Sequence, residues 1–513
     1  MKIVCAMEPH SLKAKKTSAD GGASVSRLPE YLCGGVCVLV LFVFFQFFYR
    51  YHLCHREQFS LFIYAAEPLH AYLQHPAPLA CLAGDFLTQF FSLTVVGPLL
   101  MALALTTVGM LMCQLLHPYI GHWSLLPAVA AVIMETGRQC GLTYPLSSTL
   151  QWVGILATLL VCRRVVRRLW QRCHGGAVLV GVLCLGAGMT LCGWGDWEKR
   201  AVNHPEFGIE QMFAVDNDWY RGNLDRMERR LARCDEKRNR FFTYYKNLLM
   251  ASEYRMGEDL MQVTQPFTMG LYLPVTSSTS YPVVYMSNEV WYMTGDMTNA
   301  EHSALLGMIF SPKSTGSRPL KRLAEISLVN GDEQAAMKYL RILDKTWLYH
   351  RWARARMTGM RVKSVERRLD MQRTLLATSD KVRTPMDPSA SFRHLLEDNP
   401  DNVFARDYLL SYDLLCKDVD MFKADYDRFV SHHQIPQRVW AEALLVWLAA
   451  HGASEDDVYA YNIPEQVIGE FMSYNHIYQN ADGNQFPLLQ QKFGHTYWFF
   501  YHFASRNNDR EKQ

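Results

Sequence analysis

Residues 86–134 read FLTQFFSLTVVGPLLMALALTTVGMLMCQLLHPYIGHWSLLPAVAAVIM, a stretch that contains no Asp, Glu, Lys or Arg. A helix on the surface of a soluble protein needs a polar face for water, whereas a helix surrounded by lipid needs none. The stretch therefore predicts helices that cross a membrane. From Trp197 onward, by contrast, charged residues of both signs recur every few positions. The near-zero mean hydropathy of the 513-residue chain thus averages two unlike parts.

Apolar runs on both sides of this stretch also have the length that a membrane helix requires, about 20 residues. The qualifying segments are Tyr31–Tyr49, Ser92–Leu116, Trp123–Gly141, Ser147–Cys162 and Ala177–Trp194. No small-residue cleavage site follows the first segment, so it is interpreted as an uncleaved anchor. We expect an all-α protein in three parts: a cytoplasmic basic tail (1–30), a transmembrane bundle of about five helices (31–196) with a long outer loop at 50–91, and an extracytoplasmic helical-repeat domain (197–513).

Two clusters of basic residues indicate the orientation. Lysines precede the first segment and arginines separate the fourth from the fifth; they are Lys13, Lys15, Lys16, Arg163, Arg164, Arg167, Arg168 and Arg172. Because basic loops stay in the cytoplasm, both clusters predict an N-terminus inside and, with an odd number of crossings, a C-terminal domain outside. In a bacterium this means the inner membrane and a periplasmic domain. The formal net charge of +3 gives no reason to expect nucleic acid as a partner.

The first outer loop carries the acids that a membrane enzyme would use. We expect residues 57–66 (EQFSLFIYAA) to lie at the interface as an amphipathic helix that Pro68 ends. Glu57, Glu67 and Asp85 then lie on the outer face near the membrane surface. Membrane sugar transferases that use lipid-linked donors place a catalytic carboxylate in their first outer loop. The alternative is that the three acids are solvated loop residues or helix caps, which the small number of helices favours.

An internal repeat organises the C-terminal part. Leu323–Leu343 (LAEISLVNGDEQAAMKYLRIL) and Ser287–Met308 (SNEVWYMTGDMTNAEHSALLGM) share one plan: a helix, a Gly-Asp turn and a second helix with small residues on one face. Glycine ends the first helix in a left-handed conformation, and aspartate caps the second. Gly295 and Gly331 lie 36 residues apart, close to the tetratricopeptide period of about 34. A weaker copy follows Glu397–Asn402 (EDNPDN), so we expect a tetratricopeptide-like solenoid, although helical hairpins of other kinds share this pattern. The concave face of such a solenoid commonly binds peptides or proteins; the alternative is a scaffold without a ligand of its own.

Several smaller patterns have both a functional and a structural interpretation, and the structural one is favoured for each. D-x-D triplets bind metals in many sugar transferases but also arise by chance in charged helices, and the histidine groups have no further ligands nearby. Glu135 and Arg138, spaced i, i+3 in a predicted membrane helix, are functional candidates. Because they lie near the end of that helix, a structural ion pair between them is favoured. The residues concerned are Asp216–Asp218, Asp418–Asp420, Asp425–Asp427, His52, Cys54, His55, His432, His433, Glu135 and Arg138.

Sequence motifs for common chemistries are absent. The chain has no HExxH, no Gly-x-Ser-x-Gly, no phosphate-binding loop and no Rossmann fingerprint, so we expect no cofactor and no metal site. Cys234 and Cys416 leave one disulfide open, but a disulfide framework is not supported. Strand signals are confined to about residues 271–285. The aromatic stretch 493–503 is expected either to form a helix that caps the solenoid or to touch the membrane surface, and the need to cover an apolar terminal repeat favours the cap.

Four segments together carry a family resemblance: GDFLTQFF at 84–91, LAEISLVNGDEQAAMKYLRILDKTWLYHRWA at 323–353, EDNPDN at 397–402 and FGHTYWFFYHF at 493–503. Over most of its length the chain resembles an uncharacterised family of Bacteroidetes membrane proteins with an N-terminal membrane bundle and a helical-repeat tail. The resemblance implies a bacterial inner membrane. It assigns no catalytic residue, because the family is a domain of unknown function. Many relatives have more membrane helices than this chain predicts.

Two hypotheses of function follow. In the first, the protein is a non-catalytic scaffold whose periplasmic domain docks a partner protein in envelope assembly or transport; this predicts exposed loop acids and a groove on the repeat domain. In the second, it is a glycosyltransferase-like membrane enzyme acting on lipid-linked substrates, with Glu57, Glu67 or Asp85 as the base. The second predicts a polar cavity between the first loop and the bundle, with one of these acids at its floor. The charge-free second segment disfavours a transporter.

Overall fold

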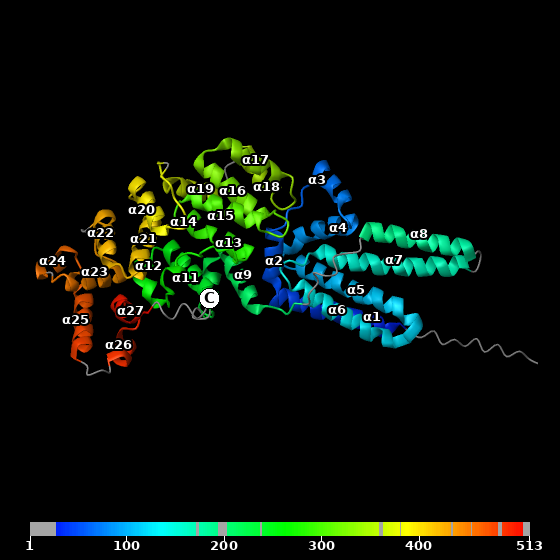
Figure 1. The fold of residues 1–513 in the computed structure, drawn as a ribbon, viewed down its shortest axis with the longest axis horizontal. Coiled ribbons are helices and arrows are strands. Elements are labelled where there is room, and N and C mark those ends of the chain that lie inside the picture. Colours follow the sequence, from blue (N-terminus) through cyan, green and yellow to red (C-terminus); the bar gives the residue numbers. More distant parts are fainter. Residues whose placement is uncertain are drawn as a thin grey trace, which may run out of the picture.

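The structure is a computed structural model built of helices joined by turns and short loops (Figure 1). It describes residues 27–505 except 171–173, 193–202, 236–238, 359–362, 380, 432–433, 453 and 481–484. No strand occurs among these described residues, which confirms the all-α prediction. In Figure 1 the bundle projects to one side of a larger helical body, and α2 (Arg50–Gln58) lies where the two meet.

The projecting bundle is made of α1 (Leu28–Val43, continued by the π-helical turn η1, Phe44–Phe48), α5 (Val96–Ile120), α6 (Leu125–Gln139), α7 (Leu146–Trp170) and α8 (His174–Cys192). These helices correspond to the five predicted segments. By length and composition, three helical stretches of the described residues are long and apolar enough to cross a membrane, namely 28–48, 96–139 and 146–170. The apolar part of α8, 176–191, is shorter.

The second of these stretches is a helical hairpin. The 3-10 turn η4 (Gly121–Ser124) joins α5 to α6, and a Cβ placed on Gly109 of α5 would lie 2.5 Å from Val132 and 3.2 Å from the carbonyl oxygen of Ala128, both on α6. Glycine is therefore needed where the two helices approach each other. Close approach through small residues is the usual way in which apolar helices associate in lipid.

Between α1 and α5 lies the segment predicted as the first outer loop; it contains α2, α3 (Ala66–Ala71), η2 (Tyr72–Gln74), α4 (Pro78–Thr88) and η3 (Gln89–Ser92). The prediction of an amphipathic interface helix over residues 57–66 is wrong. The helix lies earlier and ends at Gln58, and residues 60–64 are not helical. Pro68 does not end a helix but lies in the first turn of α3, where its missing amide hydrogen costs nothing.

The C-terminal body begins after the bundle and consists of helices joined by turns and loops in its described residues. Its elements are α9 (Phe207–Tyr220), α10 (Leu224–Leu231), α11 (Arg240–Ser252), α12 (Met256–Asp259), η6 (Leu260–Gln262), η7 (Phe267–Gly270), α13 (Tyr281–Met286), α14 (Asn288–Met293), α15 (Met297–Ile309), α16 (Ser317–Asn330), α17 (Glu333–Asp344), α18 (His350–Met357), α19 (Lys363–Thr374), α20 (Pro388–Asp398), α21 (Val403–Leu415), α22 (Val419–Phe429), α23 (Arg438–Ala450), α24 (Glu455–Ala460), α25 (Glu465–Asn480), α26 (Gln485–Phe493) and α27 (Tyr497–Phe503).

The predicted Gly-Asp turns have the expected geometry. Gly331 has φ +77°, and the carboxylate of Asp332 accepts from the amide of Ala335 at 3.0 Å, so it caps α17. Gly295 has φ +82°, and Asp296 caps α15 in the same way. In each turn the aspartate amide also donates to the carbonyl five residues earlier, as in a Schellman motif. The same turn recurs before α22, with Lys417 at φ +62°.

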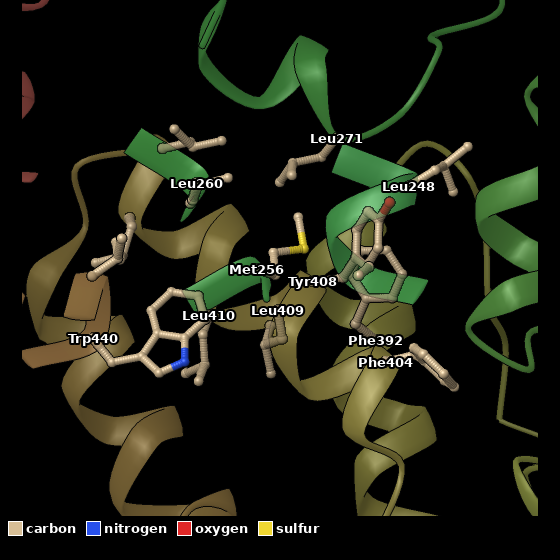
Figure 2. Packing of buried hydrophobic residues seen from close by; sticks show 14 of the residues in the cluster. Leu248, Met256, Leu260, Leu271, Phe392, Phe404, Tyr408, Leu409, Leu410 and Trp440 are labelled. Carbon is tan, nitrogen blue, oxygen red and sulfur yellow. The ribbon is translucent and has the colours of Figure 1, made fainter. Parts of the chain in front are cut away.

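One hydrophobic core runs through this body from Phe213 to Trp498. Figure 2 shows part of it, where α12 packs on α21 and α23 and where Met256, Leu410 and Trp440 belong to the same buried cluster. The C-terminal aromatic residues close the far end, with Tyr497 and Trp498 fully buried. Residues 497–503 are helical, as predicted; their role as the cap of a solenoid stays a prediction.

The predicted strand signal over residues 271–285 is wrong. Tyr281–Met286 forms the short helix α13, and the residues before it form turns and loops. The sequence YPVVYM is rich in β-branched and aromatic residues, which favour strands. Here Pro282 stands in the first turn of a helix, where proline is preorganised, and the side chains of Val284 and Tyr285 are buried by tertiary packing.

Candidate functional site

A polar helix, α2, is buried between the bundle and the C-terminal body. Its residues His52, Arg56, Glu57 and Gln58 are each less than a tenth exposed. The amides in its first turn have no partner within the helix. The carboxylate of Glu210, from α9, accepts from the amides of Tyr51 and His52 at 2.6 and 2.8 Å and so caps α2 from a distant part of the chain.

Gln58 joins α2 to a buried ionic network. Its side-chain oxygen accepts from the Arg318 guanidinium at 3.0 Å, and the same guanidinium donates to Asp216 at 2.9 Å and to Glu289 at 3.0 Å. Arg322 donates to Glu289 at 2.8 Å. Burial alone raises the pKa of Glu289, but the guanidiniums of Arg322 and Arg318 outweigh it and hold that pKa below its usual value. The network fixes α2 to α9, α14 and α16.

Glu57 points into the same body and has weaker partners. It accepts from the hydroxyl of Tyr349 at 3.3 Å and from that of Ser317 at 3.4 Å. Burial raises its pKa to about 8, against the opposing effect of these two hydrogen bonds. A cavity of about 20 Å³ lies beside it, lined also by Ser60 and Gln89. Near neutral pH the carboxyl group therefore retains its proton for much of the time.

Arg56 is a buried cation with neutral hydrogen-bond partners. Its guanidinium donates to the side chain of Gln139 and to the carbonyl of Tyr144, both at 2.6 Å, and lies 5.8 Å from the ring centre of Phe91. No carboxylate of the described residues lies within ion-pair distance of it. Burial lowers the pKa of Arg56 to about 10. A buried cation without a counter-charge is costly, which marks this position as one suited to an anion.

Asp85 lies on α4, which sits close against the start of α7. A Cβ on Gly84 would lie 2.6 Å from the backbone of Ser147, so only glycine fits at the contact. The Asp85 carboxylate accepts from the hydroxyl of Tyr72 at 2.8 Å and forms an ion pair with Lys313 from the C-terminal body. The close helix contact thus determines where this carboxylate lies.

Arg56, Asp85 and Lys313 line one cavity of about 50 Å³. Its remaining wall includes Ser60 and Thr88 of the first loop, Thr143 and Pro145 of the bundle, and Tyr281 of the C-terminal body. Two cations and one carboxylate leave one positive charge in excess. A cavity of this size holds a few water molecules or one small polar group. Its composition suits the negatively charged part of a substrate together with one general base.

The structure separates the three predicted acids. Asp85 lines the cavity just described, Glu57 lies beside the smaller cavity, and Glu67 is exposed on α3. Ser60 lines both cavities. Sequence reasoning missed Arg56 and Lys313, which lie far apart in the chain. The one local signal was an arginine next to a glutamate in a loop otherwise rich in aromatic residues.

The smaller patterns have structural roles where the structure describes them. Glu135 and Arg138 pair at 3.2 Å, as expected, and Glu135 also accepts from Tyr144 and Thr149. The three D-x-D triplets are divided between ion pairs and helix caps; Asp216 and Asp218 bind arginines, Asp418 caps α22, and Asp425 binds Arg393. Cys234 and Cys416 are not joined by a disulfide. His432 and His433 lie outside the described residues.

The buried histidines of α2 do not form a ligand set with Cys54 among the described residues. The His55 ring stacks on Phe213 with ring centres 4.0 Å apart, and His52 stacks on Tyr49 at 4.8 Å. Burial lowers the pKa of His52 to about 3, with a smaller contribution from Arg56. Both rings therefore act as neutral aromatic packing groups.

Comparison with known proteins gives one family. The model described as "Family of unknown function (DUF6057)" matches residues 26–197 and 193–504. No curated protein and no solved structure matches the chain.

Proposed function

The chain belongs to the family of unknown function DUF6057, and we propose that it is a membrane transferase. Its substrate is a lipid-linked anion bound at the outer surface of the bundle. The observation that carries the proposal is the cavity shared by Asp85, Arg56 and Lys313. It lies between the first outer loop, the bundle and the C-terminal body, where a lipid headgroup and a water-soluble acceptor meet. A carboxylate and an uncompensated buried cation in one cavity are typical of active sites.

The residues have separate roles in this proposal. Arg56 and Lys313 bind the phosphate that links the transferred sugar to its lipid, and Lys313 exchanges its ion pair with Asp85 for one with that phosphate. Asp85, then free, accepts the proton of the acceptor hydroxyl as its oxygen forms a bond to the anomeric carbon. The bond from that carbon to the phosphate oxygen breaks, and the lipid phosphate leaves with the bonding electron pair. The two cations stabilise the charge that develops on it.

Binding and transfer are tested separately with the full-length chain in lipid nanodiscs. Undecaprenyl phosphate serves as the probe for binding, and a lipid extract with lipid-linked sugars serves as the donor. Arg56→Gln is expected to weaken binding of the probe at least about tenfold, because the anion loses its buried cation. Asp85→Asn is expected to retain binding and to lower transfer at least about a hundredfold, because the base is lost.

Glu67→Gln is the matched control, since Glu67 lies in the same loop and is exposed. It is expected to leave both quantities unchanged. Binding that is indifferent to Arg56 overturns the proposed role of the cavity. Transfer that survives Asp85→Asn overturns the role of Asp85 as base.

A second function, a protein-binding scaffold, is supported by the hairpins of the C-terminal body. Successive helix pairs such as α14–α15 and α16–α17 share one turn geometry, and the α20–α21–α22 segment repeats it. Stacked hairpins of this tetratricopeptide-like kind offer an extended surface to peptides and proteins. Crosslinking in native membranes tests this function. A reproducible protein partner that is retained after Arg56→Gln supports the scaffold, whereas co-purifying lipid-linked glycan alone supports the transferase.

We place the protein in a bacterial inner membrane with the C-terminal body in the periplasm. Supporting this orientation, the Arg163 guanidinium donates to the carbonyls of Leu115 and Gln114 at 2.6 and 3.2 Å. The arginine-rich end of α7 therefore lies at the same end of the bundle as the C-terminus of α5 and the start of α1. We assign this end of the bundle to the cytoplasm, because the positive-inside rule keeps arginine clusters there.

A further inference from the structure

Three metal-binding side chains meet at the end of the bundle remote from the C-terminal body. They are Glu30 in the first turn of α1, His117 in the last turn of α5 and His122 in η4. One ligand atom from each lies within 4.8 Å of the other two. Among the described residues this is the one such group of three histidine, cysteine or acidic donors.

The local sequence explains how two histidines five residues apart come together. Gly121 has φ +56° and ψ −136°, a conformation available to glycine but not to residues with a side chain. The chain therefore reverses directly after α5 and returns His122 to His117, and the two ring centres lie 5.9 Å apart. The packing of α1 against α5 adds Glu30 from a third direction.

The contact between Glu30 and His117 is incomplete as an ion pair. Glu30 Oε1 and His117 Nε2 lie 3.0 Å apart, yet neither atom makes a hydrogen bond of acceptable geometry with any described group. Glu30 is 3% exposed at a position where its neighbours Tyr31 and Leu32 face outward. A buried carboxylate within an apolar bundle is expensive unless it is fully paired. Two ligand atoms that lie 3.0 Å apart and have no hydrogen-bond partner are available to share one ion.

Two imidazoles and one carboxylate form a donor set typical of zinc. Zinc holds nitrogen and oxygen ligands at about 2.0–2.2 Å, so neighbouring ligand atoms are roughly 3.3–3.6 Å apart. The ligand atoms all lie within 4.8 Å of one another, so binding requires them to approach by about 1.5 Å at most. We propose that Glu30, His117 and His122 bind a divalent transition-metal ion of the zinc class, which joins the end of α1 to the turn between α5 and α6.

This site is distinct from the cavity of the proposed transferase, which lies at the opposite end of the bundle. On the proposed orientation the metal faces the cytoplasm. Three protein ligands leave one position of a tetrahedral ion for water or a further ligand. The cavity next to Glu30 is lined by the thiols of Cys33, Cys37 and Cys113, so soft donors lie beside the site. The sequence concealed the site because Glu30 and the histidines belong to different helices.

The test measures Zn²⁺ binding by the full-length chain in detergent after removal of metal with a chelator. When Zn²⁺ is added back in the presence of a chromophoric chelator that competes for it, the wild-type chain is expected to bind one Zn²⁺ per chain. His117→Ala, His122→Ala and Glu30→Gln are each expected to lower the affinity at least about tenfold. Gly121→Ala keeps every donor but strains the turn, so it is expected to weaken binding as well. The exposed His75, in the outer loop, supplies the control His75→Ala, which should leave the affinity unchanged.

Cysteine binding is separated from this site by two measurements. The triple variant Cys33→Ser, Cys37→Ser, Cys113→Ser is expected to retain the ion, and the Co²⁺-loaded wild-type chain is expected to lack the strong near-ultraviolet absorption of cobalt–thiolate bonds. Size-exclusion profiles identify any variant that fails to fold. If one of the alanine variants fails, the milder substitution His122→Gln is measured in its place. Absence of bound Zn²⁺ overturns the proposal. Affinity that survives His117→Ala and His122→Ala, or that disappears with the three cysteines alone, overturns it too.

Discussion

Glu57, Glu67 and Asp85 belong to one loop, yet each carboxyl group has a different environment. Glu67 is exposed, Asp85 is paired with Lys313, and Glu57 is buried beside two hydroxyl groups. Burial disfavours the charged form, which is why the pKa of Glu57 rises to about 8. The state of an acidic side chain is therefore decided by the residues of the C-terminal body that cover it.

The buried Glu57 makes stability depend on pH in a defined direction. Its pKa lies above the ordinary 4.5, so the folded chain binds the proton more tightly than the unfolded chain between pH 4.5 and about 8. The contribution to stability is complete below pH 4.5 and is lost as pH rises to about 8. Glu57→Gln removes the titration and keeps the shape. As pH rises through that window, we expect the free energy of unfolding of this variant to increase relative to that of the wild type by at most about 1.4 kcal/mol per pH unit.

Thermal unfolding of the detergent-solubilised chain at a series of pH values measures this difference. Glu67→Gln serves as the comparison, and its melting temperature should follow that of the wild type at every pH. Parallel curves for Glu57→Gln and the wild type would show that Glu57 is charged in the folded chain throughout.

Some contacts between individual residues can be predicted from the sequence and others cannot. The Glu135–Arg138 pair is predictable because residues three apart on a helix are neighbours. The ion pair of Arg318 with Asp216 joins residues 102 apart, and the hydrogen bond of Arg318 to Gln58 joins residues 260 apart. No local rule connects such residues, so the junction and its cavity could not be placed from sequence alone.

Among the elements, the Gly-Asp turn is the one that recurs, and its two predicted copies differ in burial. Asp332 is exposed and only caps α17. Asp296 is fully buried, caps α15, and also pairs with Arg383 at 3.3 Å. The same motif therefore serves as a local helix stop in one place and as part of the core in the other.

Substituting the two caps distinguishes these roles. Asp332→Ala is expected to lower the free energy of unfolding by about 1 kcal/mol, the usual effect of a lost cap. Asp296→Ala should lower it by roughly 3 kcal/mol or more, because Arg383 also loses its buried partner. Chemical denaturation of the full-length chain measures both values. Asp332→Asn, which can still cap, is the control and should be nearly neutral. Equal losses for the two alanine variants would contradict the assignment.

Helices with strong local signals were predictable, and a short element was not. The turns before α15 and α17 follow from glycine and aspartate, whose conformational preferences act locally. The short helix α13 was mistaken for strand because its valines and tyrosines favour extended backbone. Burial of Val284 and Tyr285 in the body outweighs that preference.

At the scale of the whole molecule, the first loop is held from both sides. The bundle contacts it through Gln139 and Ser147, and the C-terminal body through Glu210, Lys313 and Arg318. The partition into an apolar and a polar part was predictable from the distribution of charge. The cavity that the two parts share was not predictable. Hydropathy indicates whether a segment lies in lipid or in water, but it does not identify the segments against which it packs.

The proposed orientation predicts the side of the membrane on which the chain ends. A phosphatase reporter that is active only in the periplasm, fused after Gln513, is expected to be active, and a reporter that fluoresces only in the cytoplasm is expected to be dark. Both follow from the basic residues at one end of the bundle. Reporters fused after Trp170 supply the internal control, with the opposite expectation. An active cytoplasmic reporter at the C-terminus would reverse the orientation.

The capping of α2 by Glu210 and its anchoring to Arg318 have a consequence for synthesis. After His52 is synthesised, 158 further residues must be added before Glu210 exists, and after Gln58 a further 260 before Arg318 exists. At translation rates of about 5–20 residues per second, the second interval lasts roughly 13–50 seconds. During that time the first turn of α2 lacks its cap and Gln58 lacks its partner. A chain that ends before Glu210 never forms either contact, so we expect α2 to be unstable in any fragment that lacks the C-terminal body.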